Sequence, residues 1–97
     1  MSDNDYATLR DVLDRAHAQA ESGKGKERHA GEGEAFEDQQ IVQLGEWMQS
    51  THFNIGQACK KSLESVKLSR ERAIAELLGA INYLAAAVLI LDRRGGD

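Results

Sequence analysis

Apolar residues recur at intervals of three and four positions along most of the chain, a spacing that places them on one side of an α-helix. The first such stripe consists of Tyr6, Leu9, Leu13, Ala16 and Ala20. Acidic residues precede this stripe, which suits the positive end of a helix, and Gly23 follows it as a helix-ending residue. The pattern therefore predicts a first helix over about residues 4–22.

Two shorter helices are predicted in the middle of the chain, at about residues 38–50 and 54–67. Their apolar stripes consist of Ile41, Leu44, Gly45 and Met48 in the former, and of Ile55, Cys59, Leu63 and Val66 in the latter. Asp38 has a suitable N-cap side chain for the former helix. Residues 51–54 include weak helix formers, and we expect a short break there. Cys59 lies on the apolar stripe and is expected to be a small buried hydrophobe.

The last predicted helix, at about residues 70–93, is the longest and is apolar nearly all round. Ser69 is a suitable N-cap, Glu71 lies in the first turn, and Arg93 lies near the C-terminal end, where cations are favoured. A helix of this composition is normally buried on most sides. Three short helices are expected to cover only part of it, so the sequence predicts a homo-oligomer with this helix at the interface. The alternative is a compact four-helix monomer.

The composition supports a single all-α domain over residues 1–97, a small three- to four-helix bundle. The chain contains no proline, the strongest helix breaker, and its core must be aliphatic because only 5% of residues are aromatic. The net charge of −4 argues against general binding of DNA or RNA backbones. The single Cys59 allows no internal disulfide and suits a reducing compartment. The N-terminus is polar, and the longest apolar run is shorter than a membrane span. We expect a soluble cytoplasmic protein.

A glycine-rich, charged segment at residues 23–37 separates the first two helices. It does not match the Walker phosphate loop, because neither glycine–lysine pair is followed by serine or threonine. Glycines nevertheless let backbone N–H groups converge on an anion, and basic side chains supply charge. The candidate binding residues for a nucleotide phosphate are Lys24, Lys26, Arg28 and His29. The alternative is a solvated connector.

Oxygen ligands for Mg²⁺ or Ca²⁺ are present in the same segment and just after it, at Glu32, Glu34, Glu37 and Asp38. They do not match the calcium-binding loop pattern, and such charge runs are usually solvated. The three histidines share no helical spacing that would form a zinc site. The prediction is therefore that the protein has no resident metal or cofactor.

Three further candidate ligand-binding residues lie on the last helix, namely Glu76, Asn82 and Tyr83. Glu76 stands on an otherwise apolar helix, with Tyr83 on the same side. It either pairs with Arg72 or a lysine at the edge of the core, or it binds a ligand. Asn82 lies on a different side of the helix. It either gives specificity to a helix–helix contact or binds a ligand.

The stretch "AELLGAINYLAAAVLIL" resembles a helix of the MazG-like all-α nucleoside triphosphate pyrophosphohydrolases. In that family the motifs E-x-x-E and E-x-x-D hold Mg²⁺ for attack on the triphosphate. Glu76 matches the first acid of the second motif, but Gly79 stands where the family has aspartate. The preceding helix offers Glu64 without an E-x-x-E pair. The resemblance covers about a third of the chain and implies a divergent Mg²⁺-dependent hydrolase using Glu64 and Glu76, with Glu37 and Asp38 completing the metal site.

The stretches "GKGKERHAGEGEAFEDQQI", "GQACKKSLES" and "AELLGAINYLAAAV" together resemble small helical proteins of tailed phages and prophages. That resemblance implies an accessory or counter-defence role, in which some members sequester nucleotides between helices of an oligomer and others block a host protein. Three functions therefore follow from the sequence. The first is a non-enzymatic oligomeric protein that binds a phosphate-bearing ligand such as a nucleotide. The others are a protein-binding inhibitor or structural module, and the divergent hydrolase.

Overall fold

The computed structural model describes residues 3–22 and 35–93, and these residues form an all-α bundle as the sequence predicted. Within them the α-helices are α1 (Ala7–Ser22), α3 (Gln40–Met48), α4 (His52–Ser65) and α5 (Arg70–Arg93). Two short 3₁₀ turns, η1 (Asp3–Tyr6) and η2 (Phe36–Asp38), precede α1 and α3. The described residues contain no strand.

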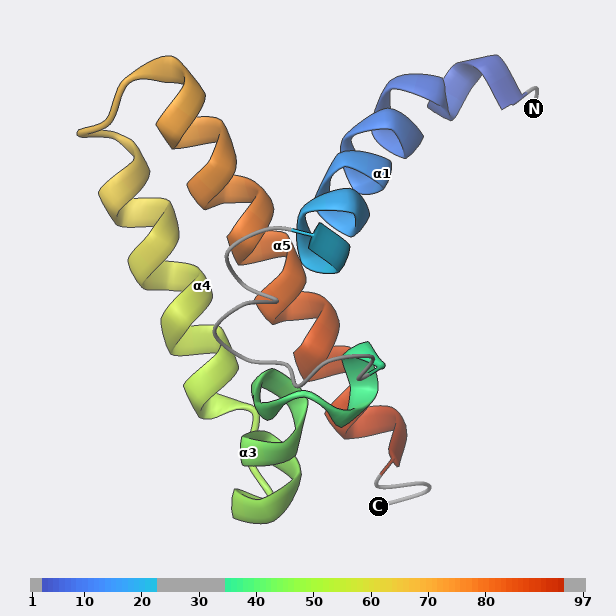
Figure 1. The fold of residues 1–97 in the computed structure, drawn as a ribbon, viewed down its shortest axis with the longest axis vertical. Coiled ribbons are helices and arrows are strands. Elements are labelled where there is room, and N and C mark those ends of the chain that lie inside the picture. The colour runs from blue at the N-terminus through green and yellow to red at the C-terminus, as the bar shows by residue number, and fades with distance from the viewer. Residues whose placement is uncertain (1–2, 23–34, 94–97) are drawn as a thin grey trace.

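The long helix α5 forms the centre of the fold, and the other helices pack around it (Figure 1). Helix α4 runs antiparallel beside α5, whereas α3 lies near the C-terminal end of α5. Helix α1 meets α5 with its C-terminal half, and its N-terminal half diverges from the bundle. Glu71 lies in the first turn of α5 and Arg93 in the last, as expected for a helix whose end charges complement its dipole.

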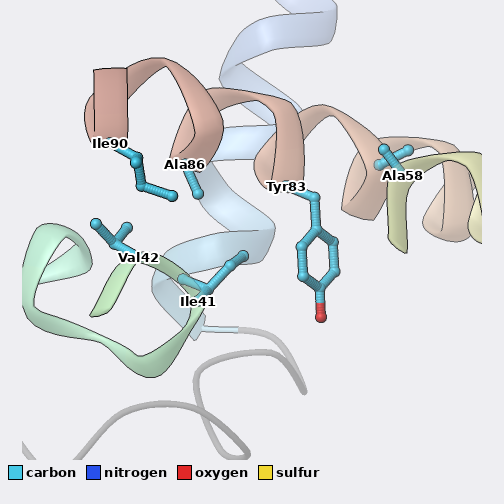
Figure 2. Packing of buried hydrophobic residues seen from close by; sticks show 7 residues of the cluster. Ile41, Val42, Ala58, Tyr83, Ala86 and Ile90 are labelled. Atoms are coloured by element: carbon cyan, nitrogen blue, oxygen red, sulfur yellow. The ribbon is translucent and has the colours of Figure 1, made fainter. Parts of the chain in front are cut away.

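The most deeply buried apolar side chains of the core lie between α3 and α5. Figure 2 shows Ile90 and Ala86 of α5 facing Val42 of α3, and all three side chains are almost completely buried. Gly45 makes this packing possible, because a Cβ atom at this position would collide with Cδ1 of Ile90. The absence of a side chain at Gly45 therefore sets how closely α3 approaches α5.

The ends of α3 and α4 differ from the sequence prediction by one or two residues. Asp38 belongs to η2, and the N-cap of α3 is Gln39, which makes no side-chain capping bond. The break between α3 and α4 covers residues 49–51, which is two residues earlier than the predicted helix ends imply. Gln49 ends α3 with a left-handed backbone (φ 52°), and its N–H bonds to the carbonyl oxygens of Glu46 and Gly45. That left-handed residue turns the chain without proline or glycine.

The inward face of α4 is not the one that its apolar stripe predicted. The side chains of Leu63 and Val66 are 72% and 82% exposed, and Cys59 is exposed rather than buried. The buried residues of α4 are the small or polar Asn54, Ala58 and Ser65. The small side chain of Ala58 lets α4 pack close to α5. Asn54 Nδ2 donates to the carbonyl oxygen of Ile41 on α3 at 2.7 Å, and Ser65 Oγ donates to the carbonyl oxygen of Ser62. Close helix approach therefore outweighs the hydrophobicity of the outer stripe.

Candidate functional site

Glu76 and Tyr83 lie together at the contact between α5 and α4. Glu76 Oε2 is 3.5 Å from Nζ of Lys61, and that ammonium group lies 5.8 Å from the centre of the Tyr83 ring. The ring of Phe53 packs edge-on against Tyr83 with a centroid separation of 6.3 Å. The structure thus shows Glu76 paired with a lysine at the edge of the core, which is the structural alternative anticipated from the sequence.

Asn82 faces a different helix. Its Nδ2 donates a hydrogen bond of 3.0 Å to the carbonyl oxygen of Ala16 on α1. A second bond joins the same two helices, from Nε2 of Gln19 to the carbonyl oxygen of Ala75 at 3.3 Å. Asn82 therefore contributes to a helix–helix contact, and the structure does not bring it together with Glu76 and Tyr83 in one site.

A groove of about 810 Å³ lies between α1, η2 and α5. Its walls are mainly apolar, and its polar residues include Asn82 and the buried Gln39. Glu21 and Ala35 also line it, so the chain on both sides of residues 23–34 borders the groove. The four basic candidates, Lys24, Lys26, Arg28 and His29, lie outside the described residues, as do Glu32 and Glu34.

Residues 3–22 and 35–93 contain no group of three or more His, Cys, Asp or Glu side chains that could hold a metal ion. Glu64 and Glu37 are exposed, and Glu76 is engaged with Lys61. Nδ1 of His17 lies 3.0 Å from Oε1 of Glu21 within α1, and His52 is exposed at the start of α4. The described part of the chain therefore does not assemble the four-carboxylate arrangement that the hydrolase resemblance implies.

The sequence predicted that part of α5 stays uncovered, and the structure shows that this part is a half-exposed apolar stripe. It consists of Ile74, Leu77, Ile81, Leu84, Val88 and Leu91, and we call it the α5 stripe. Four of its side chains are between 44% and 57% exposed, and the other two are partly buried, whereas the opposite side of α5 is buried by α3 and α4. Ile81 and Val88 of the stripe also line the groove beside α1. By length and composition α5 is also apolar enough to cross a membrane, and only 33% of its most apolar window is buried.

A second uncovered stripe runs along α4 and consists of Ile55, Cys59, Ser62 and Val66, which we call the α4 stripe. Ala58 and Ala80, both in the buried core, mark one edge of the contact between α4 and α5. Lys61 marks the other edge, since a Cβ at Gly79 would lie 3.3 Å from its Cδ. At 3.6 residues per turn, the α4 stripe lies next to Ala58 and the α5 stripe next to Ala80. The two stripes therefore share one side of the helix pair, which we call the hairpin face.

Comparison with protein-family models, with curated proteins and with solved structures finds no match to this chain. The features that can support a function are therefore those of the chain itself. They are the hairpin face, the groove beside α1, and the paired side chains of Lys61 and Glu76.

Proposed function

We propose that the protein is a non-enzymatic association module that works as a homo-oligomer through the hairpin face. One observation carries this proposal: a continuous apolar stripe runs along α5, and four of its six side chains remain about half exposed in the folded chain. Large apolar patches on a soluble domain usually mark an interaction surface. The role also matches the accessory, non-enzymatic activity that the resemblance to phage proteins implies.

The free energy available from covering this face is substantial. Complete burial of a leucine or valine side chain contributes about 1.5–3 kcal/mol, so a half-exposed one contributes about 1 kcal/mol when a partner covers it. Four side chains of the α5 stripe are about half exposed, and an oligomer would bury each of them in every copy: Leu77, Leu84, Val88 and Leu91. The α4 stripe adds Ile55 and Val66.

The structure of the helix pair favours a protein partner over a membrane. Helix α4 packs beside α5 and carries Lys60, Lys61 and Glu64. If α5 crossed a bilayer with α4 attached, each lysine near the centre would cost about 2.5–3.5 kcal/mol. If α4 detached from α5, the contacts of Lys61 with Glu76 and Tyr83 would be lost. An aqueous, cytoplasmic oligomer avoids both costs.

A matched pair of substitutions tests the proposal. Leu84→Glu places a charge in the α5 stripe, and Leu63→Glu places the same charge on the side of α4 that faces away from α5. Light scattering during size-exclusion chromatography should show an oligomer for the wild type and for Leu63→Glu, and a monomer for Leu84→Glu. A wild-type mass of one chain, 10.7 kDa, at every concentration up to about millimolar would contradict the proposal.

The groove favours a second candidate function, the binding of a phosphate-bearing ligand such as a nucleotide. Its volume of about 810 Å³ is in the range of small-molecule sites, and Glu21 and Ala35, which flank residues 23–34, line it. The purified protein should be incubated with linear and cyclic nucleotides and Mg²⁺, filtered, and then denatured. Release of an intact nucleotide would support this candidate, and a cleaved product would support the hydrolase instead. Recovery of the whole panel unbound would exclude the candidate.

A further inference from the structure

Both stripes of the hairpin face have the spacing of a helical-bundle core. Along the α5 stripe, successive residues are three or four positions apart, with Ile or Val at one core position and Leu at the other. The α4 stripe repeats the same spacing over Ile55, Cys59, Ser62 and Val66. Such heptad seams are buried in coiled coils and four-helix bundles, whereas the opposite positions face solvent.

In this protein the arrangement is reversed. The positions opposite the α5 stripe, which include Gly79 and Ala86, are buried against other elements of the same chain, whereas four of the six seam residues stay about half exposed. Within the α4 stripe, and likewise within the α5 stripe, there is no charged residue. The antiparallel pair therefore presents two uncharged seams side by side on one face.

We infer that a second copy of the same α4–α5 pair covers this face, so that the two pairs form a four-helix bundle. This inference rests on the proposed function. A four-helix core needs one seam from each helix, and a hairpin supplies two of the four. A second copy supplies the other two through a two-fold symmetric interface, in which the same surface serves both partners. No other segment among the described residues offers two adjacent seams of this kind. The assembly is a dimer.

The four-helix dimer predicts that Cys59, the single cysteine of the chain, is protected from reagents. Cys59 is exposed in one copy, and its place in the α4 stripe puts it inside the four-helix core. Its reaction with Ellman's reagent should therefore be at least about tenfold slower in the dimer than in the monomeric Leu84→Glu variant, because the thiolate must be reached by the reagent. Denatured protein gives the reaction rate of a fully accessible Cys59 and the total thiol content.

A substitution on α4 tests the inference separately from association through α5 alone. Ile55→Glu charges the α4 stripe, and Leu63→Glu on the same helix is its control. We expect Ile55→Glu to raise the dimer dissociation constant by roughly 100-fold or more and Leu63→Glu to change it by less than about tenfold. Circular dichroism of each variant establishes that the monomer remains folded.

The outcomes separate the inference from the proposed function. A dimer that is lost in Leu84→Glu but has unprotected Cys59, or survives Ile55→Glu, would mean that association uses the α5 stripe without the α4 stripe. The four-helix bundle would then be wrong, while self-association through α5 would stand. A trimer or larger oligomer would likewise overturn the bundle. A monomer that floats with vesicles of phosphatidylcholine would assign the face to a membrane and overturn both. A dimer with protected Cys59 that is lost in Ile55→Glu supports the inference.

Discussion

Asn82 on α5 donates a 3.0 Å hydrogen bond from Nδ2 to the carbonyl oxygen of Ala16 on α1, joining residues 66 positions apart in the sequence. Helix α1 meets α5 only over its C-terminal half, and Ala16 is its one buried residue. The bond therefore lies at the point where α1 is held to the bundle. A side-chain amide that bonds a single carbonyl across two helices fixes where along α5 that contact forms.

Replacing Asn82 with leucine should release α1 while leaving the rest of the bundle folded. The bond to the carbonyl of Ala16 would be lost from a partly buried contact, at a cost of about 0.5–1.5 kcal/mol. Hydrogen exchange should show faster exchange of the α1 amides, with α4 and α5 unchanged. Uniform exchange across all helices, or no change in α1, would mean that Asn82 does not position α1.

Two glycine-to-alanine substitutions should have opposite effects. A Cβ at Gly45 would collide with Ile90, so Gly45→Ala should lower the free energy of unfolding by about 1–3 kcal/mol. At Gly56 no atom lies within 4 Å of the added Cβ, so Gly56→Ala should raise stability by about 0.5–1 kcal/mol through helix propensity alone. Urea unfolding measures both, and equal effects at the two sites would contradict the packing described for α3.

The substitution Asn54→Asp should make stability depend on pH. Asn54 is fully buried and donates to the carbonyl of Ile41, and its Oδ1 has no partner among the described residues. Burial beside a carbonyl would raise the pKa of the new carboxyl above its ordinary value of about 3.9. The protonated acid can donate to Ile41, so the variant should be nearest to wild type below about pH 4 and lose stability as pH rises through the folded pKa.

This pH dependence is measured as the difference in urea midpoint between variant and wild type at each pH. The difference should widen from acid to neutral pH and then become constant. A difference that is the same at about pH 4 and pH 8, or that narrows with rising pH, would show that position 54 is hydrated rather than buried against α3.

Glu76→Gln should change stability by less than about 1 kcal/mol, because the pair with Lys61 spans 3.5 Å and both side chains retain some exposure to solvent. Lys61→Ala should cost more than Glu76→Gln, since the lysine side chain also packs beside Gly79 and Tyr83. A double-mutant cycle separates the ion pair from this packing. A coupling energy above about 2 kcal/mol would show that the pair is a principal element of the fold.

The helices were predictable from the sequence because their signals are local. Spacing, charged ends and helix-forming composition placed all four α-helices within a few residues of their observed ends. Which face of α4 packs against the core was not predictable in this way. Its more hydrophobic side carries Leu63 and Val66, but the fold buries the side with Ala58, because small residues allow a closer contact with α5.

The candidate site was likewise predictable from the sequence only in part. The sequence singled out Glu76, Asn82 and Tyr83 as polar or aromatic groups on an apolar helix, and all three make contacts between helices. Which helix each would meet depended on the registers of α1 and α4 against α5, which no single-helix pattern contains. The hairpin face was also hidden, because it appears only when the side of α4 that packs inward is known.

Sedimentation equilibrium of the unmodified protein tests the central claim most directly. Over a range from about micromolar to millimolar, concentrations that bracket ordinary dimer affinities, the data should fit a reversible monomer–dimer equilibrium with a limiting mass twice the 10.7 kDa of one chain. The same measurement on Leu84→Glu should give a single chain. A wild-type protein that remains one chain throughout this range would contradict the account of the hairpin face as a self-association surface.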